Sequence, residues 1–463
     1  MTPQHHTGRP ATTPPSTAST ASEASTVSEP AKAISLVSVI AVVAVLFTSS
    51  NLRSPVSSFP PIADVVSRAL GADTLFVGIV GMAPTAMFAV AAVLSGPLAR
   101  ALTFRAVTTT AMVLATVGFG LRAITSNEIV FLIGTMVGLV GVGITNTLLP
   151  ALVKDYFPFR LTTMSIAYMV AGQISMATAS VVAVPLEQWG GWRLAIGIWA
   201  VPPLLAALCW ALLVFAVAPG SAAERGRHVL RRSHPRQLVR AFRGGRMVAS
   251  TEKKQHNDQN SDHAEARAGY RHIWRHPVSW GIVAMFAMTS SISYCFITWA
   301  PKIVVQAGGS PTFGGVVGGV FAAMGIVTAF LCPWAVERFR AGAYVVTILS
   351  AACMYTALAM LLVNPAFLPV VWISLVALGC ATFQLGLILI ATRTRQAGAA
   401  AALSSGAQGI GYTVASVGPF VFGALFDATG SWTPGLVMLL VFNTVLFGAG
   451  LIAGRPVFVD DPR

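Results

Sequence analysis

An arginine and several hydroxyl side chains interrupt the first apolar segment of this sequence. The stretch "LFTSSNLRSPVSSFPPI" (46–62) carries Arg53 close to Ser49 and Asn51. An arginine within lipid costs about 2.5–3.5 kcal/mol on insertion scales, and ionisable groups at such depth usually serve a function. Its guanidinium keeps its proton and presents a planar fork of donors, which suits a planar or oxygen-rich anion. Ser49, Arg53 and Ser57 are spaced by four residues, so a continuous helix would carry them on one face. The stretch predicts an anion-binding site.

A structural role for Arg53 is the alternative. Its long side chain could extend along the apolar surface to the membrane interface, or it could pair with Asp64 at the end of the segment. The position of the guanidinium distinguishes the two roles.

The composition indicates a polytopic membrane protein. The chain has 463 residues, of which 55% are hydrophobic and only 10% are charged, and its mean hydropathy is +0.72. Soluble domains carry about 25% charged residues. The net charge of +14 would suit a nucleic-acid partner in a soluble protein, but thirteen of the 30 lysines and arginines lie in residues 218–277. We therefore expect a basic cytoplasmic loop, a lipid-bilayer environment and no nucleic acid.

Apolar segments of about 20 residues predict twelve transmembrane helices. They lie near 34–58, 74–98, 104–123, 129–151, 161–186, 193–217, 278–302, 313–335, 343–363, 367–391, 399–426 and 433–454. With the N-terminus inside, 25 lysines and arginines fall on the inner side and four on the outer side, namely Arg68, Arg122, Arg193 and Lys302. This asymmetry predicts an inner (plasma) membrane protein with both termini in the cytoplasm.

The two halves of the chain repeat. Thr48 aligns with Thr289, and Pro60 aligns with Pro301, without a gap between them. The predicted fold is an all-α membrane protein of two pseudo-symmetric six-helix bundles, at 32–217 and 278–455. A disordered tail (1–31), a basic linker (218–277) and a C-terminal cytoplasmic tail (456–463) complete the chain. Arg53 aligns with Tyr294, so the halves offer different polar groups at matching depth.

Five stretches resemble one transporter family. They are "NLRSPVSSFPPI" (51–62), "NTLLPALVKDYFPFRLTTMSIAY" (146–168), "VPLEQWGGWRLAIGIWAVPPLLA" (184–206), "YCFITWAPKIVVQAGGSP" (294–311) and "AAAALSSGAQGIGYTVASVGPFVFGALFDATGSW" (399–432). They are similar to the major facilitator superfamily and, within it, to the cyanate/nitroimidazole permease family. The resemblance implies alternating access, with the first, fourth, seventh and tenth helices lining a central cavity. That family name spans an inorganic anion and a neutral nitroaromatic compound, so it leaves the substrate open.

Other polar side chains inside the predicted helices complete the candidate site. Because of the helices they occupy, Asn146, Tyr294 and Gln384 are candidates for lining the cavity. Gln173, Gln408 and Tyr412 are further candidates, and the last two share a helical face. The alternative for each is a helix-to-helix hydrogen bond, which is common in membrane bundles.

The sequence argues against an enzyme. All eight histidines lie in the tail or the linker, and the carboxylates of the apolar half-chains lie near helix ends. No zinc-ligand spacing, nucleophile–histidine pair or phosphate-binding loop occurs, so we expect no metal and no cofactor. Proton coupling would require Asp64 or Glu128 to reach inward, or the substrate itself to carry the proton.

Three functions fit these observations. The first is a monomeric secondary transporter for a small anion, such as cyanate or a small carboxylate, with Arg53 as its anchor. The second is an exporter of neutral or hydrophobic compounds on the same fold. The third is a transporter-like sensor that binds a small-molecule ligand without moving it.

Overall fold

The computed structural model describes residues 36–216 and 272–461, and within these ranges the fold is helical, without strands. The predicted N-terminal tail and most of the predicted linker lie outside the described residues. Residues 272–276, which we had assigned to the linker, instead pack on the second bundle, and His276 caps the helix that follows.

The first bundle is built from elements α1 to α8. Their bounds are α1 (Leu36–Asn51), α2 (Ser54–Ser57), η1 (Pro60–Ile62), α3 (Ala63–Leu70), α4 (Thr74–Ala101), α5 (Phe104–Ile124), α6 (Glu128–Tyr156), η2 (Pro158–Arg160), α7 (Leu161–Gly197), η3 (Ile198–Ala200) and α8 (Val201–Ala216).

The second bundle is built from elements α12 to α18. Their bounds are α12 (Pro277–Gln306), α13 (Pro311–Arg338), α14 (Gly342–Val363), α15 (Pro369–Gly379), α16 (Thr382–Thr392), α17 (Ala397–Thr429) and α18 (Thr433–Ala453).

Eleven helical stretches of the described chain are long and apolar enough to cross a membrane. One of them, Thr163–Val214, has 52 residues, which is about 78 Å of helix at 1.5 Å per residue and more than twice the hydrocarbon thickness of about 30 Å. Its backbone turns at Gly191 (φ 77°, ψ 168°), a left-handed conformation that glycine adopts without strain. We infer that this stretch crosses twice, which gives the twelve predicted crossings.

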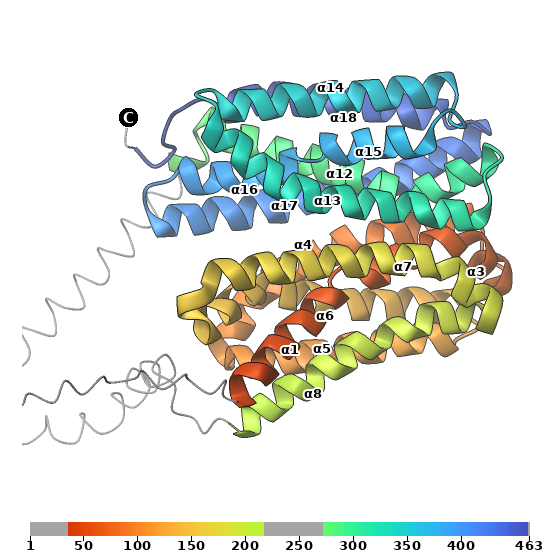
Figure 1. Cartoon of the computed structure of the whole chain (residues 1–463), viewed down its shortest axis with the longest axis horizontal. Coiled ribbons are helices and arrows are strands. Elements are labelled where there is room, and N and C mark those ends of the chain that lie inside the picture. Colours follow the sequence, from red (N-terminus) through yellow and green to blue (C-terminus); the bar gives the residue numbers. More distant parts are fainter. Residues whose placement is uncertain (1–35, 217–271, 462–463) are drawn as a thin grey trace, which may run out of the picture.

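The bundles lie against each other as two groups of roughly parallel helices (Figure 1). Helix α4 of the first bundle packs along α17 of the second, and α7 packs along α13. We call the end that holds the start of α1 and the end of α18 the terminal end. The opposite end, which holds the α5–α6 connection, is the distal end.

Close backbone contact holds α5 against α6. A side-chain carbon added at Gly118 would overlap the backbone of Gly134 and Gly138, whereas one added at Gly120 would meet nothing within 4 Å. Small residues that allow helix backbones to approach closely are the usual means of packing in membranes, where lipid removes the hydrophobic drive for association.

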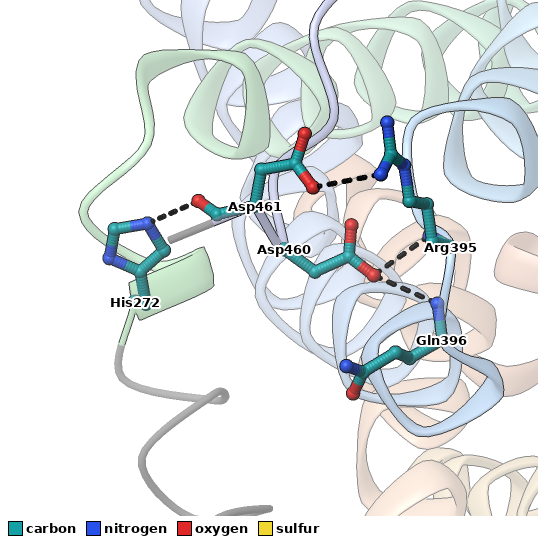
Figure 2. Close-up of polar contacts among 5 residues, drawn as sticks. All are labelled: His272, Arg395, Gln396, Asp460 and Asp461. Atoms are coloured by element: carbon teal, nitrogen blue, oxygen red, sulfur yellow. Dashed lines mark hydrogen bonds and ion pairs between the residues drawn. The ribbon is translucent and has the colours of Figure 1, made fainter. Parts of the chain in front are cut away.

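The C-terminal segment folds back onto the second bundle, as Figure 2 shows. The Asp460 Oδ2 accepts hydrogen bonds from the backbone N–H groups of Arg395 and Gln396, both at 2.8 Å, and His272 Nε2 lies 2.8 Å from the Asp461 carbonyl. Val459 is fully buried. The segment that the sequence predicted as a tail is therefore packed through Asp461.

Candidate functional site

The first membrane helix is broken at Leu52 and Arg53. Helix α1 ends at Asn51, and α2 starts at Ser54. Pro55 accounts for the break, because proline lacks the N–H that would bond to the carbonyl of Asn51 and its ring clashes with that carbonyl. The aligned helix α12 runs unbroken from Pro277 to Gln306, so the two repeats differ at this point.

The break separates Arg53 from its two serine neighbours. Ser49 Oγ donates to the carbonyl of Tyr168, and Ser57 Oγ donates to the carbonyl of Met176 at 3.0 Å. Both serines are buried against α7, while the Arg53 side chain is exposed. The prediction that all three share one face was wrong, because it assumed a continuous helix. The serines hold the broken helix on α7, and Arg53 lies outside this packed face.

Arg53 lies near the second bundle. It is close enough to Tyr294 on α12 and to Tyr412 on α17 for its charge to act on their phenols. Within the described residues it has no hydrogen-bond or ion-pair partner. Asp64, the carboxylate that we considered as its partner, pairs instead with Lys302, with Nζ and Oδ1 3.2 Å apart. Arg53 is therefore an exposed cation without a side-chain partner among the described residues, near two tyrosines of the second bundle.

Asn51 lies immediately before the break and is fully buried. Neither its Nδ2 nor its Oδ1 has a hydrogen-bond partner among the described residues. An unsatisfied buried amide costs free energy, so this side chain is available to a ligand or to ordered water near Arg53.

A second break lies in the tenth crossing. Helix α15 ends at Gly379, and α16 begins at Thr382. Two side-chain contacts attach this break to α12: the Thr382 and Thr289 hydroxyls are 2.6 Å apart, and Ser293 Oγ donates to Cys380 Sγ at 3.1 Å. Discontinuous helices are where transporters build their binding sites, and the sequence prediction had treated this helix as continuous.

The predicted glutamines occupy three different environments. Gln384 lies just after the break and donates through Nε2 to Thr328 Oγ1 at 3.3 Å, while its buried Oε1 has no partner among the described residues. Gln173 donates to the Ala322 carbonyl of the other bundle at 3.3 Å. Gln408 donates to Ser404 of its own helix at 2.9 Å. Of these, the Gln173 bond is the helix-to-helix contact given as the alternative, whereas the Gln408 bond stays within α17.

The remaining candidates also separate by exposure. Tyr294 and Asn146 are half-buried. Tyr412 is 7% exposed, and its ring packs on Phe88 and Phe286, with centroids 5.9 and 5.7 Å away. The structure thus brings Arg53, Tyr294 and Tyr412 together around the junction of the two bundles.

The bundles make polar contacts toward the distal end. Besides the Lys302–Asp64 pair, Ser180 Oγ donates to the Gly315 carbonyl at 2.9 Å. Gly81 lies so close to Thr298 that an added side-chain carbon would be 2.5 Å from its methyl group. These contacts close the distal side of the junction.

The sequence predicted that Arg122 lies at the outer surface, but in the structure it is buried. It is 1% exposed, and its Nη2 donates to the Pro55 carbonyl at 3.2 Å. Counting charges near helix ends cannot separate a surface arginine from one that turns back into its bundle, which is why the sequence prediction missed this buried cation.

Comparison with known proteins found a matching protein family and matching relatives. The family described as Major Facilitator Superfamily matches residues 39–416. A protein of Escherichia coli (strain K12) named 2-nitroimidazole transporter is 26% identical over 415 residues, covering 89% of this chain and 94% of that protein.

A shorter match and a solved structure extend this comparison. A protein of Thauera aromatica named putative anionic 4-hydroxy-benzoate permease is 38% identical over 85 residues, which is 18% of this chain and 52% of that protein. The fold matches the crystal structure of a bacterial homologue of the human lysosomal transporter Spinster with a TM-score of 0.68 at 13% identity, over 92% of this chain and 98% of that one.

Proposed function

Because the chain belongs to the Major Facilitator Superfamily and is a multi-pass membrane transporter, we propose that it moves a small planar anion across the cytoplasmic membrane, with Arg53 as the anchor. The observation that carries this proposal is the exposed Arg53 guanidinium, which has no partner among the described residues and lies near Tyr294 and Tyr412 of the second bundle. The excess of lysine and arginine on one side supports cytoplasmic termini.

Arg53 suits an anion because its five donors are free for recognition. A guanidinium binds a carboxylate or a similar planar anion through two parallel hydrogen bonds. Partly dehydrated surroundings strengthen this attraction. Tyr294, whose phenol interacts with the same charge, could add a hydroxyl donor from the second bundle. An anion held between Arg53 and Tyr294 would then contact both halves of the transporter.

Alternating access follows from that arrangement. Two polar contacts between the bundles, Asp64–Lys302 and Ser180–Gly315, lie toward the distal end, so we infer that this conformation is closed there. Rocking of the two bundles about the central site would exchange this closure for one at the terminal end. An anion that touches both bundles would bind best when they close around it, which couples binding to the motion.

A neutral substrate is the second candidate. The Escherichia coli relative named 2-nitroimidazole transporter covers most of the chain, and a nitro group can also accept hydrogen bonds from a guanidinium. The Thauera aromatica relative, whose printed name specifies an anion, covers only a small part of it. We favour the anion because a neutral substrate would leave the Arg53 charge uncompensated.

Ligand-induced thermal stabilisation of the purified protein separates the two candidates. The probes are cyanate, benzoate, 4-hydroxybenzoate and neutral 2-nitroimidazole, each added to the wild type and to Arg53→Gln. Our proposal predicts that at least one anion raises the Tm of the wild type alone. An anion that stabilises both proteins equally, or stabilisation by the neutral compound only, would refute it. Arg193→Gln is the control, because Arg193 is an exposed arginine bound to Ser126 at the distal end.

A further inference from the structure

A small cavity lies beside the distal part of the broken first helix. Its volume is about 10 Å³, and its wall includes Pro55, Phe59, Leu139, Arg122, Thr135 and Thr298. A space of this size holds roughly one water molecule or one monatomic ion. It is too small for a planar organic anion, so it is distinct from the proposed substrate position at Arg53.

Arg122 is the charged group of this cavity. It is almost completely buried and stacks over the Phe119 ring at 4.8 Å. Only one of its hydrogen bonds is made, from Nη2 to the Pro55 carbonyl, and its Nε has no partner within the described residues. No described carboxylate pairs with it. A guanidinium keeps its proton in a protein, and a buried charge without a counter-charge is costly.

The cavity also offers a hydroxyl donor from the opposite bundle. Thr135 Oγ1 already donates to the carbonyl of Phe131 at 2.8 Å. The Thr298 hydroxyl, on α12, donates to none of the described groups, although this side chain is 3% exposed. Arg122 and Thr298 line this cavity from the two bundles, so an occupant can accept hydrogen bonds from the guanidinium and from the hydroxyl, among mostly apolar side chains.

We propose that this cavity binds a halide-sized monovalent anion, such as chloride, as the counter-ion of Arg122. The ion neutralises the charge of Arg122. A water molecule in the same place could accept a hydrogen bond from the guanidinium but would leave its charge uncompensated. Because Arg122 belongs to the first bundle and Thr298 to the second, the bound ion bridges them near the closed distal end. Occupancy therefore favours the distal-closed conformation.

The test is the Tm of the full-length purified protein at constant ionic strength, with chloride replaced stepwise by gluconate. We expect chloride and bromide to raise the Tm of the wild type in a saturable way. The same response should persist in Arg53→Gln and in Arg193→Gln and disappear in Arg122→Gln. Equal Tm values in chloride and gluconate, or an unchanged response in Arg122→Gln, would overturn the proposal.

Thr298→Val provides a second test, which can still be carried out if Arg122→Gln fails to fold. Losing one hydrogen bond to the anion should raise the half-saturating chloride concentration by about tenfold. An unchanged half-saturating concentration would contradict a bridging ion. Crystals grown in bromide provide a direct view: an anomalous peak in the cavity beside the Arg122 guanidinium supports the site, and an ordered water only at that position refutes it.

Discussion

Lys302 and Asp64 form an ion pair between the two bundles, with Nζ and Oδ1 3.2 Å apart. The lysine also lies over the rings of Trp299 and Phe426, 5.8 and 5.9 Å from their centroids. This pair joins the end of the first crossing to the end of the seventh. The carboxylate is 56% exposed, so solvent screens the pair and its worth is at most about 1 kcal/mol.

We expect Lys302→Ala and Asp64→Ala each to loosen the distal closure. A cysteine introduced at the buried Ile62 should then react with a membrane-impermeant maleimide up to about fivefold faster, in line with the modest strength of exposed ion pairs. The exchanged pair, Asp64→Lys with Lys302→Asp, should return the rate toward that of the wild type. If the exchanged pair reacts as fast as the single variants, the ion pair does not hold the closure.

The helix break should depend on Pro55. Pro55→Ala restores a backbone N–H and removes the clash with the Asn51 carbonyl, so the helix can continue through Arg53. The arginine would then turn toward α7, where Ser49 and Ser57 lie, and the affinity for an anion should fall about tenfold or more, because a charge-assisted hydrogen bond is lost. Isothermal titration measures this loss. Pro185→Ala, at an exposed proline inside α7, is the matched control and should leave the affinity unchanged.

Close packing of α5 on α6 predicts that alanine substitutions at two nearby glycines, Gly118 and Gly120, change the Tm by very different amounts. Gly118→Ala must push the helices apart, because its added methyl group would overlap the Gly138 backbone. Overpacking of this kind costs about 1–3 kcal/mol, and the Tm in detergent should fall. Gly120→Ala, with open space around its added methyl group, should change the Tm little. Equal effects of the two substitutions would refute this packing.

The C-terminal segment binds the two residues that precede α17. Gln396, at the N-cap position, makes no side-chain capping bond, and Asp460 accepts from the two backbone donors instead. Asp460→Ala should therefore cost about 1 kcal/mol or more, because two hydrogen bonds to a charged group are lost, and should lower the Tm. Asp461→Ala removes only an exposed ion pair with Arg395 and should have the smaller effect. A larger loss for Asp461→Ala would contradict this role of Asp460.

Patterns along the sequence were sufficient to predict the helical architecture. The apolar runs are long and the charge is scarce, so the crossings and their division into two repeats follow from length and hydropathy. The helix ends at Asp73 and Ser310 carry the side-chain caps that their residue types favour.

The candidate site was less predictable, because it depends on where helices stop being regular. The helical spacing of Ser49, Arg53 and Ser57 assumed a continuous helix, although Pro55 was a visible signal against it. No proline adjoins the break after Gly379, so the sequence gives no comparable signal for it. The burial of Arg122 depends on contacts with Phe119 and with the backbone of α2, which no local pattern encodes.

Uptake into proteoliposomes tests the central claim most directly. Wild type, Arg53→Lys and Arg53→Gln are reconstituted at equal density, and the initial rates are measured for labelled cyanate and 4-hydroxybenzoate. If Arg53 anchors the anion, Arg53→Gln should lose uptake by about a hundredfold, as expected when a strong charge-assisted contact is removed, and Arg53→Lys should retain part of it. Anion uptake by Arg53→Gln at the wild-type rate would contradict the account.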